Sequence, residues 1–91
     1  MPTIDIRRTH QRALDDARIA IEQVMQSIAI KFGTRHRWEG DRVEFSRGGV
    51  QGHIEVGLHS VHVHARLGLL LAGMKPMIER EIQAYFDRAF D

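Results

Sequence analysis

The histidines and carboxylates in the middle of the chain are the residues whose types could do chemistry. His53, His62 and His64 alternate with apolar residues, and Glu44 and Glu55 belong to the same alternating pattern. Two histidines and a carboxylate can bind zinc or another divalent ion. A polar sheet face explains the same residues, and the sequence has no helical His-Glu-x-x-His motif. We therefore expect no metal site and keep the three histidines as the weaker candidates for metal ligands.

Other arrangements that would support catalysis are missing from the sequence. Cysteine is absent, which excludes disulfides, thiolate zinc sites and thiol catalysis. We find no Ser/His/Asp set, no phosphate-binding glycine loop and no buried pair of carboxylates, and a turn explains Gly48-Gly49. These observations predict a protein that is not an enzyme and that uses no cofactor.

Length and charge narrow the classes of protein to which the chain can belong. The 91 residues predict a single domain, 1–91. The 13 basic and 12 acidic residues leave a net charge of +1, so any basic binding site has to be local. The opening residues lack the apolar stretch of a secretory signal, and the most apolar run, residues 67–74, is shorter than the roughly 20 residues that span a bilayer. We expect a soluble, cytoplasmic protein.

The alternating segments between residues 36 and 67 predict a four-stranded antiparallel meander, since turn residues separate them at 40–41, 48–49 and 57–60. Two-residue turns allow the register to be written down. The predicted pairs on one face are Trp38–Val43, Val43–Ile54, Phe45–Gly52 and Val56–Val61. The rows predicted on the other face are Arg37, Glu44, His53, His64 and Glu39, Arg42, Glu55, His62. Neighbours of opposite charge in these rows favour this register, with one apolar face and one polar face.

Two helices and a short strand complete the predicted fold. Residues 3–7 alternate as a strand, and residues 11–32 carry an apolar stripe at helical spacing, with Thr9 as the expected cap and Gly33 as the end. Residues 74–90 repeat the helical spacing, with Pro76 in the first turn. The order β-α-β-β-β-β-α predicts an α+β fold with both helices on the apolar face of the sheet. By analogy of element order, this is a reduced helix-grip arrangement.

The leucine run near the second helix is the strongest apolar feature. In a continuing strand, Leu67, Leu69 and Leu71 point one way and Leu70 the other, so a single apolar face cannot bury them all. Either the run bends at Gly68 and Gly73, or something covers Leu70. The simplest interpretation is a core strand that leads into a helix. The functional interpretation is a patch, extended by Met74 and Met77, for a homodimer, a partner protein or a granule surface.

Two further hypotheses stay open. A cavity between the sheet and the last helix, lined by Trp38, Phe45, Val63 and Tyr85, would suit a carrier of a small hydrophobic ligand, although such residues are more often core. A basic patch could instead bind nucleic acid, but the predicted strands leave no aromatic residue exposed for stacking bases. Nucleic-acid binding is the weaker alternative. The residues of that patch are Arg7, Arg8, Arg35 and Arg66.

An ordered set of segments resembles the polyhydroxyalkanoic acid system family over nearly the whole chain. The segments are Met1-Pro2-Thr3-Ile4-Asp5-Ile6-Arg7-Arg8 with His10 shortly after, Arg37-Trp38-Glu39-Gly40-Asp41, Gly52-His53-Ile54-Glu55-Val56, and Leu67-Gly68-Leu69-Leu70-Leu71 leading into residues 75–82. The resemblance implies a link to polyhydroxyalkanoate metabolism and granules, and it supplies no catalytic residue. We therefore expect a binding protein that acts through an apolar surface or cavity near the start of the last helix.

Overall fold

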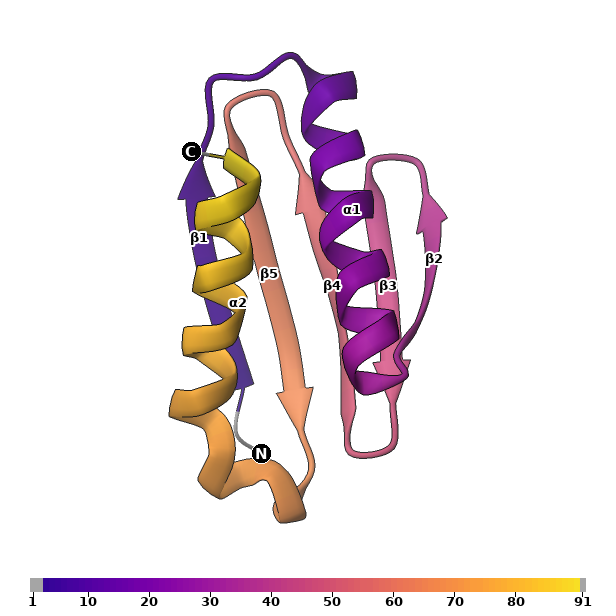
Figure 1. Cartoon of the computed structure of the whole chain (residues 1–91), viewed down its shortest axis with the longest axis vertical. Helices are drawn as coiled ribbons and strands as arrows, with labels where there is room; N and C mark the ends of the chain where they lie inside the picture. Colours follow the sequence, from indigo (N-terminus) through magenta and orange to yellow (C-terminus); the bar gives the residue numbers. More distant parts are fainter. Residues whose placement is uncertain (1–2, 91) are drawn as a thin grey trace.

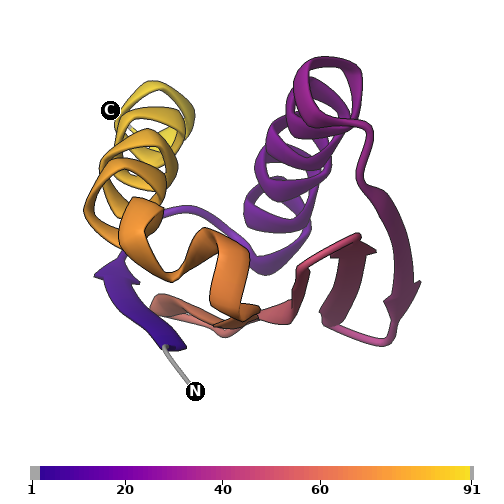
Figure 2. The same ribbon diagram turned by 90° about the horizontal axis from the view of Figure 1, so that it is seen from below.

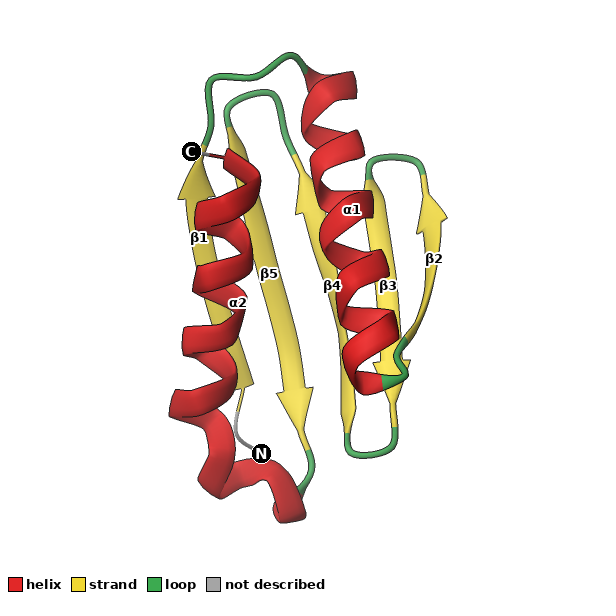
Figure 3. Ribbon diagram, viewed as in Figure 1, coloured by secondary structure: helices red, strands yellow, loops and turns green. Residues whose placement is uncertain are grey.

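The structure, a computed structural model, describes residues 3–90. Its elements follow the predicted order, with one short 3₁₀ helix added before the last helix (Figure 3). They are β1 (Thr3–Thr9), α1 (Leu14–Phe32), β2 (Arg35–Glu39), β3 (Arg42–Arg47), β4 (Val50–Val56), β5 (Ser60–Leu67), η1 (Leu69–Met74) and α2 (Lys75–Phe90).

The strands form one antiparallel sheet in the order β1-β5-β4-β3-β2. The predicted register of the meander is confirmed at every pair, from Trp38 opposite Val43 to Val56 opposite Val61. β1, whose place the alternation did not predict, pairs with β5 and puts Ile4 opposite Ala65. The first strand therefore closes one edge of the sheet, and β2 forms the other edge.

Both helices pack on the same face of the sheet, which confirms the α+β prediction (Figures 1 and 2). α2 lies over β1 and β5, while α1 lies over β4 and β3 (Figure 1). Ile21 and Met25 of α1 and Phe86 of α2 are almost fully buried against Ile4 and Val63 of the sheet. The other face of the sheet remains open to solvent. The likeness to a helix-grip fold stays a prediction.

The predicted start of the first helix is wrong. Thr9 is the last residue of β1, opposite Ser60, and does not cap a helix. The chain stays extended through His10, whose side chain is buried between two parts of the backbone: its Nδ1 accepts from the Arg12 amide at 3.1 Å, and its Nε2 donates to the Gly57 carbonyl at 2.8 Å. α1 begins only at Leu14 because the pairing of β1 with β5 extends as far as Thr9.

The leucine run does not continue as a strand. β5 ends at Leu67, and the chain turns at Gly68 into η1, which runs directly into α2 (Figure 3). Of the two alternatives left open by the sequence, the bend at Gly68 is the one the structure has, and a core strand leads into a helix as the simplest interpretation predicted. At the opposite end of this segment, Pro76 lies in the first turn of α2, as predicted.

Candidate functional site

The end of the molecule formed by η1 and the first turn of α2 exposes large apolar side chains. Leu69 is 86% exposed and Leu70 is 96% exposed, while Met74 and Met77 are 42% and 55% exposed. We call these four residues the leucine end. The preceding Leu67 is fully buried. The bend at Gly68 thus separates a core leucine from two adjacent leucines that face solvent.

The turn between β3 and β4 holds the leucine end in place. The Gly68 amide donates to the Gly49 carbonyl at 2.8 Å, and the Leu71 amide donates to the Gly68 carbonyl at 3.0 Å. Leu71 packs on Gly49, where a Cβ atom would lie only 3.1 Å from the Leu71 Cδ1, and where φ is +87°. Because Leu71 points inward onto this turn, Leu69 and Leu70 are left projecting from a fixed backbone.

The structure does not bring Trp38 and Tyr85 together around one cavity. Trp38 lies on β2 at one edge of the sheet, and Tyr85 lies on α2 above the other edge, with α1 between them (Figures 1 and 2). Phe45 and Tyr85 are half-buried against the core, and Val63 is 1% exposed within it. The Arg88 guanidinium lies 4.8 Å from the centre of the Tyr85 ring. These aromatic residues act in packing.

Glu22 of α1 makes a polar contact with β2 that the sequence pattern missed. Its carboxylate accepts from the Trp38 indole at 2.8 Å, from the His36 ring at 3.1 Å and from Gln26 at 2.8 Å. Burial raises the pKa of Glu22, but these three hydrogen bonds outweigh it and hold the pKa below its ordinary value. The Arg18 guanidinium covers the Trp38 ring at 5.1 Å. The cluster attaches the edge strand to α1.

Replacing Glu22 with glutamine is expected to lower the free energy of unfolding by about 1 kcal/mol at pH 7, a value reduced for partial exposure to solvent. Because the pKa is lowered on folding, this stabilisation is present above the ordinary value of 4.5 and is lost as the pH falls through the folded pKa below it. Urea unfolding followed by the fluorescence of Trp38, the one tryptophan, measures the difference in unfolding free energy between the variant and the wild type at pH 7 and at pH 3. Glu39→Gln, on an exposed side chain, is the control. A difference that stayed constant down to pH 3 would contradict this account.

The histidines lie on the open face of the sheet in the predicted rows. His53 stacks on His64 at 5.5 Å between ring centres, and the Arg42 guanidinium lies 3.1 Å from the His53 Nδ1. Burial, and then Arg42, lower the pKa of His53. The His62 Nε2 bonds the Asp5 carboxylate at 2.7 Å, which lowers the pKa of Asp5. Among residues 3–90, no group of three or more such side chains is placed to hold a metal ion. The contacts join neighbouring strands.

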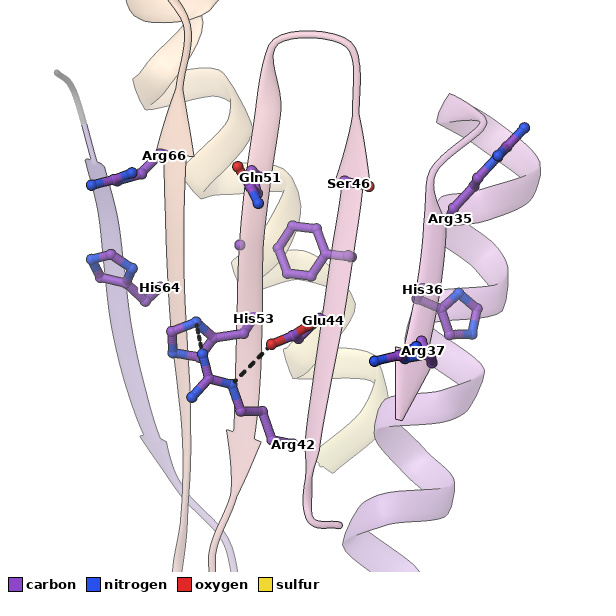
Figure 4. Close-up of a pocket in the computed structure, with 12 residues that line it drawn as sticks. Arg35, His36, Arg37, Arg42, Glu44, Ser46, Gln51, His53, His64 and Arg66 are labelled. Atoms are coloured by element: carbon purple, nitrogen blue, oxygen red, sulfur yellow. Dashed lines mark hydrogen bonds and ion pairs between the residues drawn. The ribbon is translucent and has the colours of Figure 1, made fainter. Parts of the chain in front are cut away.

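A shallow hollow of about 510 Å³ lies on the same open face (Figure 4). Arg35, Ser46, Gln51 and Arg66 line it and form one row across four strands. The predicted patch that joined these arginines to Arg7 and Arg8 is wrong. Arg7 lies two rows farther along the sheet, opposite His62, and Arg8 pairs with Asp87 of α2 on the covered side. The basic residues therefore divide between two regions.

Comparison with protein families decides the affiliation of the chain. A model of the polyhydroxyalkanoic acid system proteins matches residues 4–90. The chain belongs to this family. No curated protein and no solved structure matches it.

The family match spans every element that the structure describes, from β1 to the end of α2. It therefore includes both the leucine end and the open face of the sheet. Within residues 3–90, no helix is long and apolar enough to cross a membrane.

Proposed function

We propose that this member of the polyhydroxyalkanoic acid system family is a non-enzymatic binding protein that attaches to polyhydroxyalkanoate granules through its leucine end. The observation that carries the proposal is the exposure of Leu69 and Leu70, 86% and 96%, on a backbone that Gly49 and Leu71 hold in place. Large apolar side chains that gather at one end of a small domain mark an interaction site. The family's link to the polyhydroxyalkanoic acid system supports a granule as the partner.

The methionines of the leucine end suit contact with an irregular surface. Met74 and Met77 flank the two leucines on the helical side and are half-exposed. Methionine side chains are unbranched and adapt to uneven apolar contacts. Burying a leucine side chain contributes roughly 1.5–3 kcal/mol, so two leucines can supply much of a micromolar affinity.

The double variant Leu69→Ser/Leu70→Ser is expected to bind isolated polyhydroxyalkanoate granules at least tenfold more weakly than the wild type. The measurement is co-sedimentation with granules over a range of protein concentrations. The matched control is Ile19→Ser/Ile30→Ser, which removes two exposed apolar side chains, 58% and 89% exposed, from α1 instead. The control is expected to bind as the wild type does.

Two results would contradict the proposal. The first is equal binding by the leucine variant and the wild type, or an equal loss in the α1 control. The second comes from light scattering: a stable wild-type dimer that Leu70→Glu converts to a folded monomer would show that a second copy of the chain covers the leucine end.

A further inference from the structure

Four basic residues lie at the same end of the molecule as the leucine end, although the whole chain carries a net charge of only +1. Arg35 begins β2, Arg47 ends β3, Arg66 lies next to the end of β5, and Lys75 begins α2. All four of these element ends lie toward the end of the molecule that is lowest in Figure 1 and that Figure 2 shows from below, spread across the width of the sheet. None of the four residues has an ion pair with any other residue in the described range 3–90. Their charge is therefore open to an external partner.

Four aspartates lie at the opposite end, although Glu79 and Glu81 lie in the half of α2 nearest the leucine end. Asp15 and Asp16 lie in the first turn of α1, Asp41 lies in the turn between β2 and β3, and Asp87 lies near the end of α2. Asp41 contacts Arg18 at 3.5 Å, and Asp87 is bound by Arg8. These four aspartates thus lie far from the exposed leucines, whereas Arg35, Arg47, Arg66 and Lys75 lie at the same end of the molecule as those leucines.

The basic and apolar groups are close neighbours in the register. Arg47 lies opposite Val50, which lies opposite Leu67, and Arg66 is adjacent to Leu67 in the chain. A hollow of about 490 Å³ lies where β3 ends, β4 begins and β5 ends. Its lining includes Arg47, Gly49, Arg66 and Gly68. Gly68 begins the bend into η1, so Arg66 and the exposed Leu69 are separated by only two residues of the chain.

We infer that the leucine end docks on an anionic phospholipid surface, with Leu69 and Leu70 among the acyl chains and Arg47, Arg66, Arg35 and Lys75 at the phosphates. This inference rests on the proposed function and names the surface that the leucine end meets. Bare polyester is uncharged, so the leucines would contribute to binding it and the four basic residues would not. An anionic lipid interface matches both, since interfacial proteins combine apolar insertion with attraction to anionic lipid, and guanidinium binds phosphate through paired hydrogen bonds.

The test measures binding to vesicles of phosphatidylcholine alone, to vesicles with added phosphatidylglycerol, and to lipid-free polyhydroxybutyrate particles. The wild type is expected to prefer the vesicles with phosphatidylglycerol by roughly tenfold or more, and higher salt is expected to weaken that preference. Arg47→Gln/Arg66→Gln and Leu69→Ser/Leu70→Ser are each expected to lose roughly tenfold on those vesicles. The matched control, Arg7→Gln/Arg37→Gln, removes the same charge from exposed positions outside this end and is expected to bind as the wild type does.

The outcomes separate the inference from the proposed function. Binding to lipid-free particles that needs the leucines, without preference for phosphatidylglycerol, overturns the inference and leaves the proposed function standing. An equal loss in Arg7→Gln/Arg37→Gln, or vesicle binding that ignores the leucines, also overturns the inference. A wild-type protein that binds neither vesicles nor particles contradicts both the inference and the proposed function. All these variants alter exposed side chains, and circular dichroism verifies that each remains folded.

Discussion

Replacing Leu67 with alanine is expected to lower the free energy of unfolding by about 3 kcal/mol, whereas the same replacement at Leu70 is expected to change it by less than about 0.5 kcal/mol. Leu67 is the last residue of β5, lies opposite Val50 and is fully buried in the core. Its truncation leaves a cavity that the surrounding strands and helices cannot fill. Leu70 is 96% exposed, so its truncation removes almost no buried area.

Urea unfolding of the two alanine variants, followed by circular dichroism, compares identical chemical changes three residues apart. Leu70→Ala serves as the matched control, because both substitutions remove the same atoms. Equal destabilisation by the two substitutions would show that Leu70 belongs to the core. The leucine end would then not be a binding surface, and the proposed function would lose its structural basis.

The leucine run also shows where a sequence pattern stops being informative. Five apolar residues around Gly68 fit a strand, a bend or a helix start equally well, because periodicity needs polar positions to mark a face. The structure resolves the choice through a tertiary contact, the Gly68 amide with the Gly49 carbonyl of a distant turn. A contact of that kind lies outside any local window.

The meander was predictable for the opposite reason. Two-residue turns fix the register of a hairpin, and a slip by one residue would turn every side chain to the other face. The cross-strand neighbours Arg37–Glu44 and Arg42–Glu55 supported the predicted register independently, and both pairs are confirmed as neighbours. The same register correctly placed His53 opposite His64 on the open face.

The remaining differences come from long-range contacts. β1 pairs with β5, and this pairing extends to Thr9 and shifts the helix start to Leu14. Glu22 lies outside the apolar stripe of α1, yet β2 curls upward far enough for Trp38 to reach it (Figure 2). Helical periodicity indicates which side is polar, but it does not indicate which polar residue meets an edge strand.

Replacing Gly52 with alanine is expected to lower the free energy of unfolding by about 3 kcal/mol or more, because the added methyl group overpacks the centre of the sheet. Gly52 lies on β4 between Phe45 and Ala65. A Cβ atom there would lie 2.4 Å from the His64 carbonyl oxygen and 2.8 Å from the Ala65 Cα. Both are backbone atoms of β5, so relief requires the two strands to move apart and their hydrogen bonds to lengthen.

Gly48→Ala is the matched control for this substitution, since a Cβ atom at Gly48 meets nothing within 4 Å and its φ is not positive. It is expected to be neutral or to stabilise by up to about 1 kcal/mol, through the reduced freedom of the unfolded chain. Urea unfolding followed by Trp38 fluorescence measures both variants. A Gly52→Ala protein as stable as Gly48→Ala would mean that β4 and β5 do not approach as closely as the structure has them. The row that places His53 beside His64 would then need to be redrawn, because it depends on the same pairing.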